Sequence, residues 1–247
     1  MAVPAFLSSR AALAGLALLA GACSPDRGDA IGPASATDYA ALRDFTRVEA
    51  VGPDHVVITV GKPFAVKAQG DARALATLEI RVKDGSLVVG RKDGWRSWWG
   101  HGDDGKGVTV HVSMPAIAGA TLTGSGDLDI DSARTESLSL GLAGSGDMRI
   151  GTISAQRLKA EIGGSGTLAL SGTANDADIA IAGSGDVNAP GLKLGKGSVS
   201  IAGSGSATFA SDGPVSVDLV GSGDVTVKGK AQCRVNAIGS GEAHCGA

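Results

Sequence analysis

A Gly-Ser-Gly triplet recurs seven times in the second half of the chain, with its first glycine at residues 124, 144, 164, 183, 203, 221 and 239. The intervals are 20, 20, 19, 20, 18 and 18 residues. A regular period of this length is typical of repeat proteins, in which one repeat cannot bury its apolar face alone and several must stack. The triplet therefore constrains the fold more than any other feature of the sequence.

Apolar residues keep fixed positions relative to each triplet. They lie two residues before its first glycine, four after it and six after it, and these offsets are all even. Because successive side chains of a strand point to opposite faces, even offsets place these residues on one face. The first copy has Leu122, Leu128 and Ile130 at the three positions, and the third copy has Ile162, Leu168 and Leu170.

The two glycines of each triplet fall on the same inward face. Residues without side chains permit a bend and backbone dihedral angles that others avoid, so we expect a corner there. Each repeat is then a bent strand followed by a short polar connector, such as residues 131–137. Rungs stacked about 4.8 Å apart would pair their backbones and bury a continuous apolar column. The sequence predicts an all-β fold, a right-handed parallel β-helix with rungs of 18–20 residues.

The β-helix domain is expected to cover residues 43–247, with the seven triplets in residues 119–247. Residues 43–118 lack the triplet but contain alternating apolar residues, as in Val56, Ile58 and Val60. Turn sequences such as Gly61-Lys62-Pro63 separate these runs, which is typical of β-strands. We expect them to form irregular first rungs and an amino-terminal cap.

Residues 1–22 have the organisation of an export signal, with Arg10, an apolar run at 11–20 and small residues before Cys23. The run is shorter than the roughly 20 residues of a membrane-spanning helix. Residues 19–23, Leu-Ala-Gly-Ala-Cys, resemble a bacterial lipobox, in which the cysteine is acylated; an ordinary A-x-A cleavage site at the same bond is the alternative. We expect a signal peptide, lipidation of Cys23, a tether at 23–42, and export as an outer-membrane lipoprotein.

The cysteine count supports a lipid anchor and a disulfide. If Cys23 is acylated, Cys233 and Cys245 remain to pair in an oxidising compartment. Cys233 lies six residues before the last triplet and Cys245 six residues after its first glycine, so both belong to inward columns on either side of one corner. We expect a disulfide across the last rung.

Together these features resemble the bacterial family called putative auto-transporter adhesin, head GIN domain. The resemblance rests on the export signal, the triplets followed by Asp, the strand set at 45–89 and the segment 108–115 before the first repeat, and it covers about residues 45–240. It implies a β-helical fold in the envelope or on the cell surface. It supplies no catalytic residues.

The position three residues after each first glycine points outward by the same parity. It carries Asp127, Asp147, Asp186 and Asp224, with Thr167, Ser206 and Glu242 in the remaining copies. This acidic column either contacts a ligand or cation, or accepts hydrogen bonds near the corner and faces solvent. Neighbouring carboxylates at rung spacing repel by only about 1 kcal/mol in water, so the column can stand without a cation. We expect no metal and no cofactor.

All three tryptophans, Trp95, Trp98 and Trp99, lie in one polar loop, residues 91–107, between two strands. Exposed aromatic side chains can stack on sugars or enter a membrane interface. The alternative is that they fold over the end of the β-helix as a plug. This loop is the best candidate for ligand contact in the sequence.

Charge and residue pattern exclude some classes of function. Without residues 1–22, which contain one basic residue, 21 basic side chains face 25 acidic ones, so no nucleic-acid surface is expected. The serines belong to the repeat, whereas a nucleophile needs a base beside one unique copy, so we predict that the protein is not an enzyme. We expect a surface or envelope protein that contacts glycans, envelope components or neighbouring cells. The alternatives are a structural or regulatory periplasmic protein and a polysaccharide-cleaving enzyme.

Overall fold

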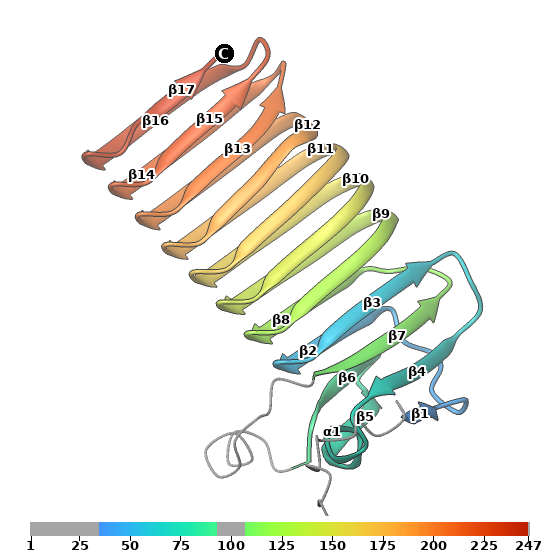
Figure 1. The fold of residues 1–247 in the computed structure, drawn as a ribbon. Coiled ribbons are helices and arrows are strands. Elements are labelled where there is room, and N and C mark those ends of the chain that lie inside the picture. Colours follow the sequence, from blue (N-terminus) through green and yellow to red (C-terminus); the bar gives the residue numbers. More distant parts are fainter. Residues whose placement is uncertain (1–34, 93–106, 247) are drawn as a thin grey trace, which may run out of the picture. The chain divides into compact units, whose positions relative to one another are not determined.

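The computed structural model describes residues 35–92 and 107–246. A β-solenoid of about six turns forms most of this part of the chain (Figure 1). Its strands are β8 (Gly119–Gly124), β9 (Asp127–Gly144), β10 (Asp147–Gly164), β11 (Thr167–Gly183), β12 (Asp186–Gly203), β13 (Ser206–Ser211), β14 (Pro214–Gly221), β15 (Asp224–Lys228), β16 (Gln232–Gly239) and β17 (Ala243–Cys245).

Neighbouring rungs pair in parallel, and equivalent repeat positions lie beside one another. Leu128 pairs with Met148, and Met148 pairs with Leu168. The first glycines pair in the same way, Gly124 with Gly144 and Gly144 with Gly164. The predicted parallel β-helix, its period and its corners are therefore confirmed.

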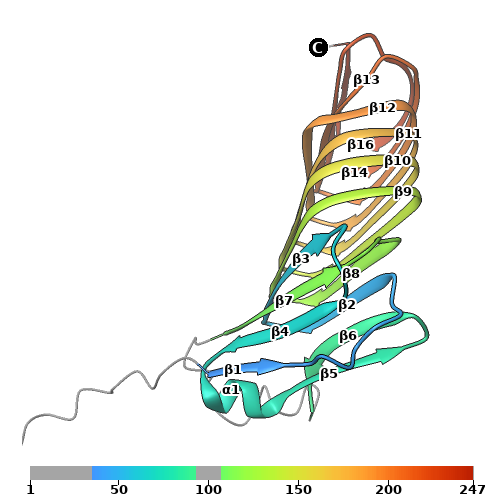
Figure 2. The ribbon, with the colours of Figure 1, turned by 90° about the vertical axis from the view of Figure 1, so that its right-hand side faces the viewer.

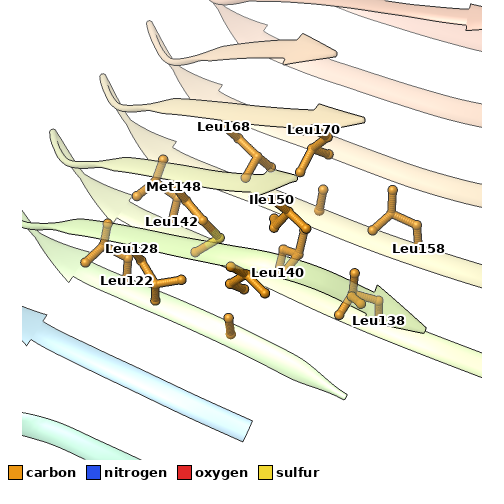
Figure 3. Close-up of a cluster of buried hydrophobic side chains, with 14 of the residues drawn as sticks. Leu122, Leu128, Leu138, Leu140, Leu142, Met148, Ile150, Leu158, Leu168 and Leu170 are labelled. Carbon is orange, nitrogen blue, oxygen red and sulfur yellow. The ribbon is translucent and has the colours of Figure 1, made fainter. Parts of the chain in front are cut away.

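The predicted apolar columns form the core between the two legs of each rung. Leu122, Leu128 and Leu168 are at most 1% exposed, and Figure 3 shows these side chains with their neighbours pointing into the same interior. The columns lose this cover at the last rung, where Val235 is 42% exposed and Ala237 is also exposed. Among the described residues no strand pairs with the outer side of β16, so its inward side chains have nothing stacked on them.

The predicted polar connector at residues 131–137 is wrong, because β9 continues through it. Ser132 pairs with Thr152 and Ala133 with Ile153. The connectors of successive rungs also pair in parallel, with register shifts between β10 and β11, β11 and β12, and β12 and β13, so their amides and carbonyls extend the ladder around a second turn. Ala133 and Ile153 point into the core and are 0% and 1% exposed, which the triplet-based offsets did not indicate.

The leader strands include two further rungs of the solenoid. Strands β2 (Arg47–Gly52) and β3 (His55–Val60) run parallel to β8 and β9. Gly52 pairs with Gly124, so Gly52-Pro53-Asp54 is a corner in the place of a Gly-Ser-Gly triplet. Strands β6 (Ser86–Arg91) and β7 (Val108–Met114) run parallel to β2 and β3 and form the preceding rung.

An irregular cap covers the amino-terminal end of the stack, as predicted. Strand β5 (Leu78–Lys83) pairs antiparallel with β6, and β4 (Ala65–Gly70) pairs antiparallel with both β7 and β1 (Ser35–Asp38). The short helix α1 (Ala72–Thr77) joins β4 to β5, and the Asp71 side chain accepts hydrogen bonds from its first amides. Figure 2 shows β1, β5 and α1 together at this end. No helix in the described ranges is long and apolar enough to cross a membrane.

Candidate functional site

The Gly-Ser-Gly triplets and Gly52-Pro53-Asp54 lie on successive rungs along one edge of the solenoid, which we call the corner edge. At this edge the chain turns with a positive φ, for example 127° at Gly144. From the second triplet on, the serine amide donates to the carbonyl oxygen of the first glycine of the preceding rung, as in Ser145 N to Gly124 O at 3.0 Å. In the first triplet Gly126 N donates to Gly52 O at 3.0 Å. The serine side chains are exposed, so a row of hydroxyl groups follows the edge.

The acidic column runs beside the corner edge and supports the next rung. Asp186 Oδ1 accepts from the backbone N of Ser206 at 2.9 Å and from its Oγ at 2.6 Å. Asp224 Oδ1 accepts from the N of Glu242 at 3.0 Å, and Asp147 Oδ1 accepts from the N of Thr167 at 3.3 Å. These three carboxylates thus use one oxygen to cap a backbone amide, and their side chains remain on the solvent side of the strands.

Arg149 lies beside the acidic column near its first rungs, and Asp129, the next outward residue on β9, lies near Arg149 and His55. Arg149 donates to Asp147 Oδ2 at 2.8 Å and lies 3.9 Å from Asp129 Oδ1. The Nε2 of His55 lies 2.7 Å from Asp129 Oδ2. Within residues 35–92 and 107–246, no group of three or more His, Cys, Asp or Glu side chains is placed to hold a metal ion.

The two strands that flank the tryptophan-bearing segment, β6 and β7, form one rung and adjoin the segment at its corner side. Register places Ala50 beside Val89 and His55 beside Thr109, so the chain leaves this rung after Arg91 and returns at Val108, beside the Gly52-Pro53-Asp54 corner. Trp95, Trp98 and Trp99 themselves lie outside the described residues. Both ends of their segment therefore start from the edge that carries the acidic column.

Asp54 holds both ends of this segment in place. Its carboxylate is 4% exposed, and it accepts hydrogen bonds from Arg91 Nε at 3.0 Å, from Arg91 Nη2, and from the backbone N of Val108 at 3.2 Å. Arg91 Nη1 donates in turn to Ala74 O at 2.6 Å and Thr77 Oγ1 at 2.8 Å, both in α1. A buried carboxylate requires such partners because leaving water costs free energy.

Sequence reasoning missed Asp54 because it located corners by the residues Gly-Ser-Gly, which are absent at positions 52–54. A signal was nevertheless present. Ala50, Val56 and Ile58 lie two residues before, four after and six after Gly52, which are the offsets of every other corner. A search for the offsets alone would have found this rung.

The two predicted disulfide cysteines come together. Cys233 in β16 and Cys245 in β17 are bonded, which links the two legs of the last rung. Cys23, the predicted lipidation residue, lies outside the described residues.

Comparison with known proteins gives one family and several structures. The model of a family described as putative auto-transporter adhesin, head GIN domain, matches residues 44–231. A putative adhesin from Bacteroides fragilis is similar in structure, with a TM-score of 0.77, 22% identity, and 86% of this chain and 97% of that chain covered. A putative adhesin from Parabacteroides merdae has a TM-score of 0.66 at 20% identity over 86% and 96% of the two chains. A protein from Parabacteroides distasonis described as a putative lipid binding protein has a TM-score of 0.67 at 19% identity over the same shares, 86% and 96%. No curated protein matches the chain.

Proposed function

This chain belongs to the putative auto-transporter adhesin, head GIN domain family, and on that premise we propose that it is a non-catalytic adhesin or binding scaffold of the bacterial cell envelope. The solenoid holds a rigid, extended surface, and the corner edge presents it to ligands such as glycans or other envelope components. The observation that carries the proposal is the placement of the acidic column and of both ends of the tryptophan-bearing segment on this edge.

The corner edge has the chemistry of a polar contact surface. Its serine hydroxyls and carboxylates donate and accept hydrogen bonds, and their backbone is fixed by the rung ladder. Trp95, Trp98 and Trp99 supply the aromatic faces on which sugar rings stack, and Asp127, Asp147, Asp186 and Asp224 supply acceptors along the column. Preorganised groups of this kind lose little entropy on binding.

We propose further that the protein is exported and anchored by acyl chains on Cys23, with residues 23–42 as the tether to the outer membrane. The support is the lipobox-like sequence before Cys23 and the pairing of the other two cysteines with each other. A disulfide of this kind persists in oxidising compartments.

The binding role is tested by substituting Trp98→Ala and Trp99→Ala together in the full chain. We expect binding to bacterial cells or to a glycan array to fall about tenfold or more, since aromatic residues dominate such contacts, while the melting temperature stays unchanged. Unaltered binding would remove the segment from the site. Release of reducing or unsaturated sugars by the wild-type protein would instead make it a polysaccharide-cleaving enzyme.

The location is tested by mass spectrometry of the mature amino terminus together with protease treatment of intact cells. An acylated Cys23 and a domain that is cleaved from outside support a surface-exposed lipoprotein. An unmodified terminus on a protected, soluble domain indicates a structural or regulatory periplasmic protein and contradicts the anchor.

A further inference from the structure

A groove of about 590 Å³ lies beside the second turn of the rungs, away from the corner edge. Its floor is the backbone around Gly197, Val215 and Cys233, which lie on the paired strands β12, β14 and β16. Two rows of outward side chains form its walls. One row contains Asp176, Lys196, Pro214 and Gln232, and the other contains Ser198, Ser216 and Arg234.

The groove runs across the strands and therefore along the stack. Register pairs Asp176 with Lys196, Ser198 with Ser216, and Ser216 with Arg234, so each wall gains one side chain per rung. Figure 1 shows β11, β12, β14 and β16 as successive layers. Its volume falls in the range of roughly 300–1,000 Å³ that is usual for ligand sites. The short side chains of Ser198 and Ser216 keep it open, whereas Asp178 on β11 and Lys159 on β10 occupy the same row farther along the stack.

The lining of the groove holds two basic side chains, Lys196 and Arg234, and one acidic side chain, Asp176, on a protein whose net charge is −3. Lys196 forms a 2.8 Å ion pair with Asp176, but the guanidinium of Arg234 makes no ion pair or hydrogen bond with any described residue. The second turn of the same rungs adds Lys193, Lys228 and Lys230. Against them stand Asp178, which pairs in register with Ser198, and Asp212, which pairs with Lys193 at 2.6 Å. Hydrogen bonds from Lys193 and from the Lys230 amide lower the pKa of the Asp212 carboxyl, so it remains ionised.

We propose that this groove binds a segment of an acidic polysaccharide, with Arg234 and Lys196 contacting its carboxylates. Guanidinium and ammonium groups favour carboxylate oxygens, and Ser198, Ser216 and Gln232 offer hydrogen bonds to sugar hydroxyls. The rungs repeat about every 4.8 Å, which is comparable to the length of one pyranose residue. A polysaccharide lying in the groove thus meets one outward side chain of each row at each successive sugar, with Lys196 and Arg234 two rungs apart.

The described walls contain no aromatic side chain on which nucleic-acid bases would stack, and this favours a saccharide over a nucleic acid. The inference rests on the proposed function in one respect, namely that the ligand is met outside the cell. It does not depend on the corner edge. A groove variant should therefore lose binding of the acidic polysaccharide, whereas the Trp98→Ala, Trp99→Ala variant should keep it. This difference distinguishes the groove from the corner edge.

The test uses the full chain and an oligogalacturonate, with the methyl ester of the same oligomer as the neutral probe. We expect saturable binding of the oligogalacturonate in titration calorimetry, binding of the ester weaker by about tenfold or more, and further weakening with added salt. The variant Lys196→Gln, Arg234→Gln should lose affinity to a similar extent. The matched control is Lys159→Gln, which removes a charge from the Arg234 row outside the groove and should bind as the wild type does.

Each outcome decides the proposal, provided that the variants melt at the wild-type temperature. Equal affinity for acid and ester, or wild-type affinity in the double variant, overturns the role of the two cations. Equal affinity for single-stranded DNA overturns the saccharide class. If the wild type binds neither the oligogalacturonate nor a sulfated dextran, the groove is not a binding site for acidic polysaccharides. That result leaves the proposal for the corner edge unaffected.

Discussion

The corner glycines lie where the solenoid leaves almost no room for a side chain. Backbones of successive corners approach so closely that a Cβ on Gly146 would overlap the carbonyl oxygen of Gly126. The first glycine of each triplet adds a second restriction, since its φ is positive, as at Gly144. A Cβ on Gly163, one residue before a corner, meets no atom within 4 Å.

Substitution at these glycines should therefore separate into two classes. We expect Gly146→Ala to lower the free energy of unfolding by about 1–3 kcal/mol, because a backbone must move to accept the methyl group. Gly163→Ala, the matched control, should change it by no more than about 0.5 kcal/mol. Urea denaturation followed by circular dichroism measures both values. Equal effects of the two substitutions would contradict a specific requirement for glycine at the corner.

Asp54 is the second residue on which local structure depends. Its partner Arg91 is 16% exposed, so the pair is largely removed from water. We expect Asp54→Asn to lower the free energy of unfolding by about 3–5 kcal/mol, since it leaves a buried guanidinium without its counter-charge. The comparison is Glu136→Gln in the Arg157–Glu136 pair, whose side chains are 63% and 76% exposed; there we expect about 1 kcal/mol or less. A loss at Asp54 no larger than at Glu136 would contradict its anchoring role.

At the scale of the element, one rung is the unit that can be removed. Residues 147–166 run from Asp147 to Gly166, the second glycine of the next triplet. Gly146 and Gly166 hold the same position in successive rungs, because each packs on the second glycine of the preceding rung. Deleting them joins equivalent positions, so all later rungs keep their inward columns. We expect a folded solenoid that is shorter by about 4.8 Å, measurable by small-angle scattering. Deletion of residues 147–156 alone places a corner on the wrong edge and should abolish folding. Loss of folding in both deletions would show that the rungs are not equivalent.

The sequence predicted the rungs that carry the triplets better than it predicted the connectors and the corner at Gly52-Pro53-Asp54. Parity around each triplet placed Leu128 and Met148 in the core because a strand has only two faces. The connectors were missed because their pairing comes from stacking in register: Ser132 pairs with Thr152 through its neighbours, without any repeated motif of its own. Gly52-Pro53-Asp54 was missed because backbone geometry is kept at that corner while two of three residue types differ.

The candidate sites were predictable to different degrees. The acidic column follows from a single offset in one repeat, so Asp186 and Asp224 could be identified directly. The groove could not be, since its walls join Lys196 on β12 to Arg234 on β16, two rungs away. The repeats differ in length, with intervals of 18 to 20 residues. The register shift that absorbs this difference lies at the second turn between β12 and β13, whereas the triplets stay in register.

For the molecule as a whole, charge is distributed unevenly around the stack. The corner edge carries the acidic column, and the second turn towards the carboxyl-terminal end carries Lys193, Lys196 and Lys230 together with Asp176 and Asp212. Parallel stacking produces this division, because each outward position of the repeat becomes a continuous row along the solenoid. A single domain thereby offers two surfaces of different chemistry on fixed sides.

The disulfide at the last rung changes how that end of the molecule responds to a pull. Under tension a terminal strand ordinarily separates from its neighbour by breaking its hydrogen bonds one after another. Here the sulfur bridge joins Cys245 in β17 to Cys233 near the start of β16. Force applied beyond Cys245 passes through the bridge to β16, which is paired with β14 along its whole length. The residues between the two cysteines, which include the last corner, are therefore not extended by the force.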